Sequence, residues 1–144
     1  MALIPLLAEE ITEFGTPEAT TTVAASVETS RTYMVDWQTG RVGGFIDGLE
    51  ALRQAIYKIL QTERFAHLIY SWWYGFEGNK LLGQTRGIVE AEAERYVAEA
   101  LTADDRIDRI EGFTLTFHGK RAATAVFTAV SNIGDVEITT EVTF

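Results

Sequence analysis

The sequence predicts an α+β fold, in which two main helices pack on an antiparallel β-meander after an extended arm and a β-hairpin. Apolar residues recur at helical spacing within residues 48–62 and again within residues 86–101. The last third changes to β-rich runs separated by turn residues. At 144 residues the chain is long enough for one hydrophobic core. We therefore expect an N-terminal arm over residues 1–30 and a single domain over residues 31–144.

The predicted arm has two parts. Residues 16–30, TPEATTTVAASVETS, lack large apolar side chains and have little to bury against the entropy of ordering. The first part is apolar enough to dock, through Leu3, Ile4, Leu6, Leu7, Ile11 and Phe14. Its partner is either its own domain or a neighbouring subunit.

A hairpin and a helix follow the arm. TYMVDW and RVGGFI are rich in β-forming residues around the turn QTG, and Gly43 and Gly44 weaken the second strand or mark a bulge. Asp47 and Glu50 fit a capping box at a helix start. The apolar stripe of this helix is Leu49, Leu52, Ala55, Ile56, Ile59 and Leu60.

The second helix, residues 86–101, has one apolar and one glutamate-rich face, and we expect ADDRI to end it. The runs FTLTFHG, RAATAVFTAV and DVEITTEVTF then predict three strands. In the last run, strict alternation predicts one buried face and one face toward water or a partner. The members of the apolar set are Val136, Ile138, Thr140, Val142 and Phe144.

Composition excludes several classes of function. The net charge of −9 repels phosphate backbones and anionic lipid, so we expect no nucleic-acid or membrane partner. The chain has no cysteine and no apolar run long enough for a bilayer. The apolar start is followed by Glu9 and Glu10, the wrong charge order for a secretory signal. We expect the protein to stay where it is made unless an assembly carries it out.

The stretch LQTERFAHLIYSWWYG, residues 60–75, holds the main candidate for chemistry. Glu63 beside aromatic residues would suit a general acid, but adjacent Arg64 favours its charged form. A glycoside hydrolase needs a second carboxylate at a defined distance, and none of the five candidates stands out. These candidates are Asp36, Asp47, Glu50, Glu77 and Asp104.

No other catalytic or cofactor motif is present. His67 and His118 lack metal-ligand spacing, and GRVGG lacks the features of a phosphate loop, so no metal or cofactor is expected. Glu63 and Arg64 then form either an internal ion pair that fixes the loop or a contact with a partner. Trp72, Trp73 and Tyr74 likewise either pack inside the domain or contact a partner, and at least one tryptophan is expected in the core.

The order of motifs resembles the baseplate proteins of contractile phage tails and PBSX-type defective prophages. These belong to the sheath-initiator, or lysozyme-like wedge, family of contractile injection systems. The motifs VDW, DGLEALRQAIYKIL, TERF, YSWWYG and ALxxDDRI occur in the family's order, and the similarity covers residues 32–110 by motif. Thr62, Glu63, Arg64 and Gly75 match positions of the family pattern.

The resemblance implies a structural role in the tail baseplate of a virion, assembled in the host cytoplasm. Six copies would surround the tube, bridge wedge proteins to the tail sheath protein, and template the first sheath ring by β-strand exchange. Tube or hub proteins are possible partners of the arm. The contact residues would be Glu63, Arg64, Trp72, Trp73, Tyr74, Val136, Ile138, Thr140, Val142 and Phe144. The alternative is a peptidoglycan-cleaving, lysozyme-type tail hydrolase.

Overall fold

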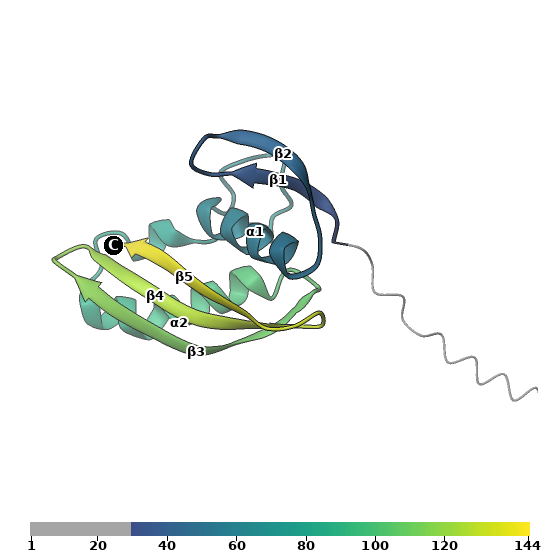
Figure 1. The fold of residues 1–144 in the computed structure, drawn as a ribbon. Coiled ribbons are helices and arrows are strands. Elements are labelled where there is room, and N and C mark those ends of the chain that lie inside the picture. Colours follow the sequence, from purple (N-terminus) through teal and green to yellow (C-terminus); the bar gives the residue numbers. More distant parts are fainter. Residues whose placement is uncertain (1–29) are drawn as a thin grey trace, which may run out of the picture.

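The computed structural model describes residues 30–144 and confirms the α+β fold (Figure 1). The predicted arm lies outside the described residues, except for Ser30. The elements in chain order are β1 (Thr32–Asp36), β2 (Arg41–Ile46), α1 (Gly48–Gln61), the 3₁₀ turn η2 (Gly78–Leu81), α2 (Arg86–Leu101), β3 (Ile107–His118), β4 (Ala122–Ser131) and β5 (Val136–Thr143).

The predicted hairpin is confirmed as the antiparallel pair β1–β2. Its register shifts between the pairs Tyr33–Phe45 and Val35–Val42, so β2 carries one extra residue. This irregularity falls at Gly43 and Gly44, where the sequence indicated a weakened strand or bulge.

Both predicted helices form, and each buries most of its expected apolar stripe. Asp47 is the N-cap of α1, but its carboxylate accepts from the amide of Gly48, at 2.7 Å, rather than from the third helical amide of a capping box. Leu52, Ile56 and Ile59 of α1 are buried, whereas Leu49 near its start is 42% exposed. Helix α2 has the predicted bounds of residues 86–101.

The C-terminal meander is confirmed, with strand order β3-β4-β5. The prediction was wrong about where its first strand begins: β3 starts at Ile107, six residues before the predicted run FTLTFHG. Asp108, Arg109 and Glu111 break the β-rich composition there, yet all three are exposed, because this part of β3 needs only occasional inward residues such as Ile107.

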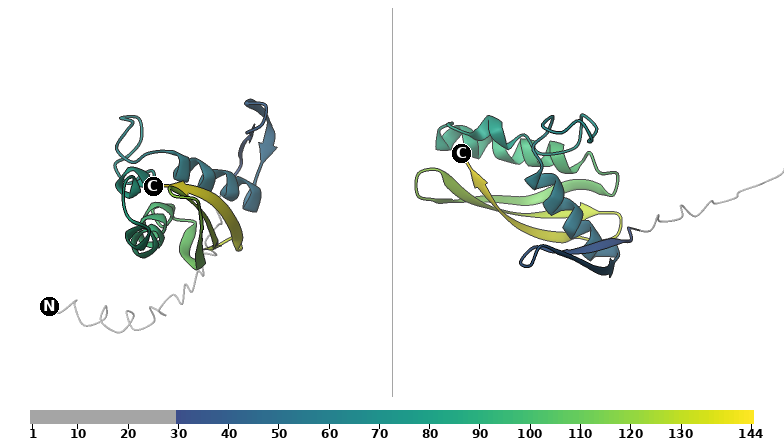
Figure 2. Two further views of the ribbon diagram at one scale, coloured as in Figure 1. Left: turned by 90° about the vertical axis from the view of Figure 1, so that its left-hand side faces the viewer. Right: turned by 90° about the horizontal axis from the view of Figure 1, so that it is seen from above.

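The core lies between the meander and the two helices, which cover the same face of the sheet (Figure 2). Small residues of β4 face the helices around Phe127, which is 1% exposed. They are Ala123, Ala125, Ala129 and Ser131. Helix α1 lies between the sheet and the β1–β2 hairpin (Figure 1). Within residues 30–144, no helix is both long and apolar enough to span a bilayer.

Candidate functional site

The stretch that holds Glu63 and Arg64 is closed at its base by main-chain pairing. The amide of Phe76 donates to the carbonyl of Thr62 at 2.8 Å, and the amide of Arg64 donates to the carbonyl of Phe76 at 3.2 Å. These bonds form an isolated parallel bridge between Glu63 and Phe76. Phe76 is 9% exposed and packs into the core. The end of α1 is thus tied to the start of η2, and residues 65–74 project between them as an aromatic loop.

Gly75 makes this closure possible. Its φ is +108°, a conformation that L side chains rarely adopt. A Cβ atom at this position would lie 2.7 Å from the Thr62 carbonyl oxygen and 3.0 Å from the Arg64 amide nitrogen. No flexible side chain can move aside, because both atoms belong to the backbone. The bridge therefore requires glycine here.

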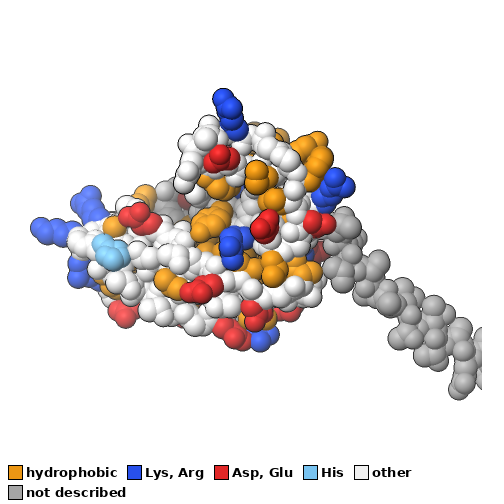
Figure 3. Space-filling view, viewed as in Figure 1, with side chains coloured by type: hydrophobic (Ala, Val, Ile, Leu, Met, Phe, Trp, Pro, Cys, Tyr) orange, Lys and Arg blue, Asp and Glu red, His pale blue; other side chains and the backbone are white. Residues whose placement is uncertain are grey.

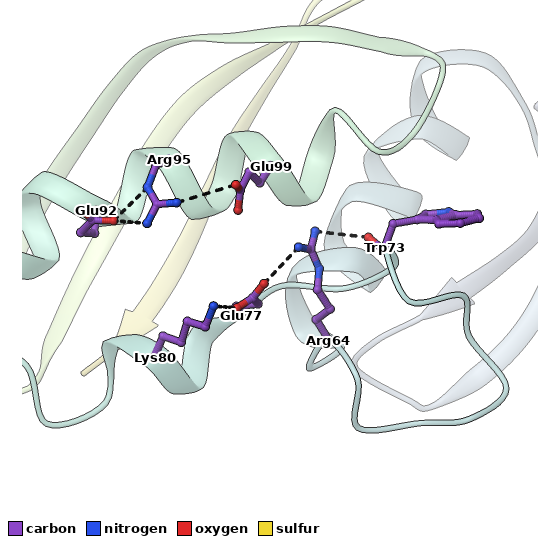
Figure 4. Close-up of polar contacts among 7 residues, drawn as sticks. All are labelled: Arg64, Trp73, Glu77, Lys80, Glu92, Arg95 and Glu99. Carbon is purple, nitrogen blue, oxygen red and sulfur yellow. Dashed lines mark hydrogen bonds and ion pairs between the residues drawn. The ribbon is translucent and has the colours of Figure 1, made fainter.

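Arg64 has a different ion-pair partner from the one that the sequence suggested. Within the described chain, no salt bridge joins Arg64 to its neighbour Glu63. Arg64 instead contacts the Glu77 carboxylate at 3.1 Å and donates to the Trp73 carbonyl at 3.3 Å (Figure 4). Adjacent residues near a turn diverge, whereas the bridge brings Glu77 alongside Arg64. An internal pair does fix the loop, and its acid is Glu77.

Glu77 lies between two cations (Figure 4). Lys80 pairs with its other side, and the Arg64 and Glu77 side chains are only 13% and 11% exposed. The hydrogen bond from Lys80 holds the pKa of Glu77 below its ordinary value, with burial opposing and Arg64 assisting. This cluster links α1, the aromatic loop and η2, so we interpret it as the loop's structural base.

The aromatic loop presents apolar side chains to solvent. Leu68 and Ile69 at its tip are almost fully exposed, Trp72 is 71% exposed and Trp73 is 49% exposed. The expectation that at least one of these tryptophans enters the core was wrong, because both side chains are exposed. Their rings pack edge to face on each other, with centroids 5.1 Å apart. An exposed aromatic group on a braced loop has the form of an interface anchor.

Tyr74 turns back toward the protein and is only half-buried. Its ring stacks on Tyr70 at 4.6 Å, and burial is the main cause that raises its pKa, followed by the charges of Tyr70 and Asp104. Tyr74 lines a pocket of about 230 Å³ together with Asp104 and Arg106. Arg106 bonds the Asp104 carboxylate at 2.8 Å, and no other carboxylate of the described chain lines the pocket. This arrangement lacks the carboxylate pair that the hydrolase alternative needs.

The structure places the apolar set of β5 inside the chain's own core. Val136, Ile138, Val142 and Phe144 are each no more than 5% exposed, and Thr140 is half-buried. The predicted alternation is therefore confirmed. These side chains meet the helices of their own chain, so any partner has to use the main-chain edge of β5 or its outer face.

Two hydrogen bonds show which main-chain groups of β5 face away from β4. The amide of Phe144 donates to Arg121 on the β4 side, whereas the carbonyl of Thr139 accepts from the hydroxyl of Tyr57, at 3.3 Å. Because alternate residues of a strand point to opposite sides, the odd-numbered residues 137–143 direct their amides and carbonyls away from β4. In the part of the chain that the structure describes, only β4 pairs with β5, so this edge is open to another strand apart from the contact of Tyr57.

Glu77 and Gln54 have structural roles that the sequence patterns did not predict. The sequence suggests Glu77 only as a candidate catalytic partner, although GFEG places an acid just after the glycine that closes the loop. Gln54 is 6% exposed, accepts from the Val35 amide and donates to the Tyr33 carbonyl, both at 2.8 Å. A glutamine within the apolar stripe of α1 was the only sequence signal for this brace of the hairpin.

Residues 31–134 match the family model described as contractile injection system sheath initiator. The chain is also 39% identical, over 116 residues, to the phage-like element PBSX protein XkdS of Bacillus subtilis (strain 168). That alignment covers 78% of this chain and 82% of the relative. Both findings agree with the resemblance carried by the sequence motifs.

Proposed function

Because the chain belongs to the contractile injection system sheath initiators, a family of structural tail proteins, we propose that it nucleates the sheath by strand pairing. In this proposal it sits in the virion's baseplate, in six copies, and acts without enzymatic activity. The first ring of tail sheath protein adds strands to it. The particle assembles in the host cytoplasm.

The observation that carries this proposal is the regular, open edge of β5. The β4–β5 register runs without interruption from Ala122–Thr143 to Ala129–Val136, so the outward groups of β5 are evenly spaced. An added strand gains main-chain hydrogen bonds along such an edge. It would displace the Tyr57 hydroxyl where it reaches Thr139.

The opposite edge of the sheet suits strand addition less well. Strand β3 has register shifts between Ile107 and Arg109 and between Glu111 and Thr114. Gly112, with φ of +65°, lies in the second irregularity. Bulges of this kind bend a strand and interrupt its pairing groups, a usual protection of edges. The two edges thus differ, which favours β5 over β3 as the edge for strand addition.

The aromatic loop is the proposed contact with wedge proteins. Trp72 and Trp73 would act as anchors, and partly exposed Glu63 would meet a cation of the partner. The Arg64–Glu77 pair would hold the loop in shape before binding, which lowers the entropy lost on association. The β5 edge and the aromatic loop would then bridge sheath and wedge.

Glu141→Pro tests the strand pairing. Proline removes the outward amide of residue 141 and leaves the β4 ladder intact, since prolines are tolerated on edge strands. Glu141→Ala is the matched control, because it removes the same exposed side chain and keeps the amide. We expect tails carrying Glu141→Pro to have baseplates and tubes without sheath, as seen by electron microscopy.

Normal sheaths on Glu141→Pro tails would refute pairing at β5. Far-ultraviolet circular dichroism and thermal unfolding of the purified variants would confirm that both fold. Deletion of residues 135–144 would not serve this purpose, because it removes Val136, Ile138, Val142 and Phe144 from the core.

A further inference from the structure

The β1–β2 hairpin has an outward apolar face that the rest of the described chain leaves uncovered. Tyr33 stacks on its cross-strand partner Phe45 at 4.7 Å, and the two rings are 58% and 56% exposed. Val42, in the next pair along the hairpin, is 66% exposed. In Figure 3, hydrophobic side chains reach the surface over this hairpin with Lys or Arg side chains beside them. A two-stranded sheet with a bare apolar face is marginal in water, which indicates that something covers it.

The charges around this face point to an acidic occupant. Arg31 lies over the Phe45 ring at 4.3 Å, and both Arg31 and Arg41 are exposed. Neither arginine forms a salt bridge with another residue of 30–144. Asp36 is the cross-strand partner of Arg41, but its carboxylate accepts hydrogen bonds from Gln38 and Thr39 instead of pairing with that arginine. Asp47 caps α1.

Residues 1–29 have the matching composition. This segment contains five glutamates and no lysine or arginine. Six leucine, isoleucine and phenylalanine residues precede Gly15, interspersed with Glu9, Glu10 and Glu13. Apolar side chains suit the rings of Tyr33 and Phe45, and the glutamates suit the two arginines.

The point where the described chain begins makes this contact geometrically easy. Ser30 and Arg31 directly precede β1, at the border of the apolar face. A random coil with as many residues as the segment 16–30 has a root-mean-square span of about 20 Å. The six residues of β2 extend over about 20 Å as well. A tether that matches its target in length gives a high effective concentration.

We propose that residues 3–14 dock in cis on the outer face of the β1–β2 hairpin, defined by Tyr33, Val42 and Phe45, with their glutamates at Arg31 and Arg41. The segment would cover the apolar face of the free protein before the baseplate assembles. This inference concerns a surface separate from β5 and does not depend on sheath binding.

Paramagnetic relaxation in the full-length chain tests the contact, since the absence of cysteine allows one specific spin label. A label on Ala8→Cys should abolish the amide signals of Tyr33 and Phe45 and spare those of residues 65–73. Adding Leu7→Ser and Ile11→Ser should restore the signals, whereas the matched pair Thr21→Ser and Thr22→Ser should not.

Three results would overturn the proposal. The hairpin signals could stay intact, they could remain broadened with the serine pair at residues 7 and 11, or the broadening could centre on the aromatic loop. A mixture of spin-labelled chain and isotope-labelled, spin-free chain identifies the remaining occupant. Broadening in that mixture would assign the contact to a second copy and also refute docking in cis.

Discussion

Replacing Gly75 with alanine probes the closure of the aromatic loop. The left-handed φ of +108° costs a residue with a side chain about 1–3 kcal/mol. The new Cβ atom would also meet the Thr62 carbonyl oxygen at 2.7 Å, and backbone overpacking of this kind adds about 1–3 kcal/mol. We expect a total loss of about 2–6 kcal/mol in the free energy of unfolding, a large part of the roughly 5–15 kcal/mol of a typical domain.

Urea unfolding followed by circular dichroism measures this loss by linear extrapolation. Gly83→Ala is the matched control, because Gly83 also has a positive φ, +79°, but a Cβ atom added there would meet nothing within 4 Å. The control should lose only about 1–2 kcal/mol from the backbone conformation. If Gly75→Ala destabilises the protein no more than Gly83→Ala, the collision with the backbone is not the reason for glycine at this position, and the proposed role of Gly75 in loop closure is wrong.

Three further variants test other parts of the structure. Arg64→Ala should lower the free energy of urea unfolding by about 1–3 kcal/mol, because Glu77 stays buried with one partner fewer. Lys80→Ala should lower it less, because the Lys80 side chain is exposed. Equal losses in the two variants would contradict this ranking. The stability difference between the wild type and Glu77→Gln should be full above the ordinary glutamate pKa of 4.5 and shrink as pH falls through the lowered pKa; a difference independent of pH would count against the charged cluster. Gln54→Ala should lower the free energy of unfolding by about 1–3 kcal/mol and speed hydrogen exchange at the Val35 amide. The exposed control Gln61→Ala should change neither quantity. Unchanged exchange at Val35 in Gln54→Ala would argue against the brace.

Local patterns predicted most of the fold. Helical spacing located α2 at its observed bounds and α1 within one residue, and strict alternation identified the buried face of β5. The start of β3 was missed because Asp108, Arg109 and Glu111 resemble a loop by composition. An exposed part of a strand tolerates such residues, and only the pairing with β4 defines it as a strand.

The candidate site was less predictable, because its contacts join residues distant in sequence. The Arg64–Glu77 pair depends on the bridge between Glu63 and Phe76. Hydrophobic periodicity in the sequence does not predict such a bridge. Adjacent opposite charges suggested a pair at residues 63 and 64 instead. The exposure of Trp72 could not be predicted either, since an aromatic run is typical of both a core and an interface.

We propose that sheath subunits pair with the open edge of β5, and a cryo-electron microscopy structure of the assembled baseplate would show this pairing directly. We expect a sheath strand hydrogen-bonded to the outward main-chain groups of residues 137–143, with the Tyr57 hydroxyl displaced from Thr139. A first sheath ring whose strands leave this edge unpaired would contradict it.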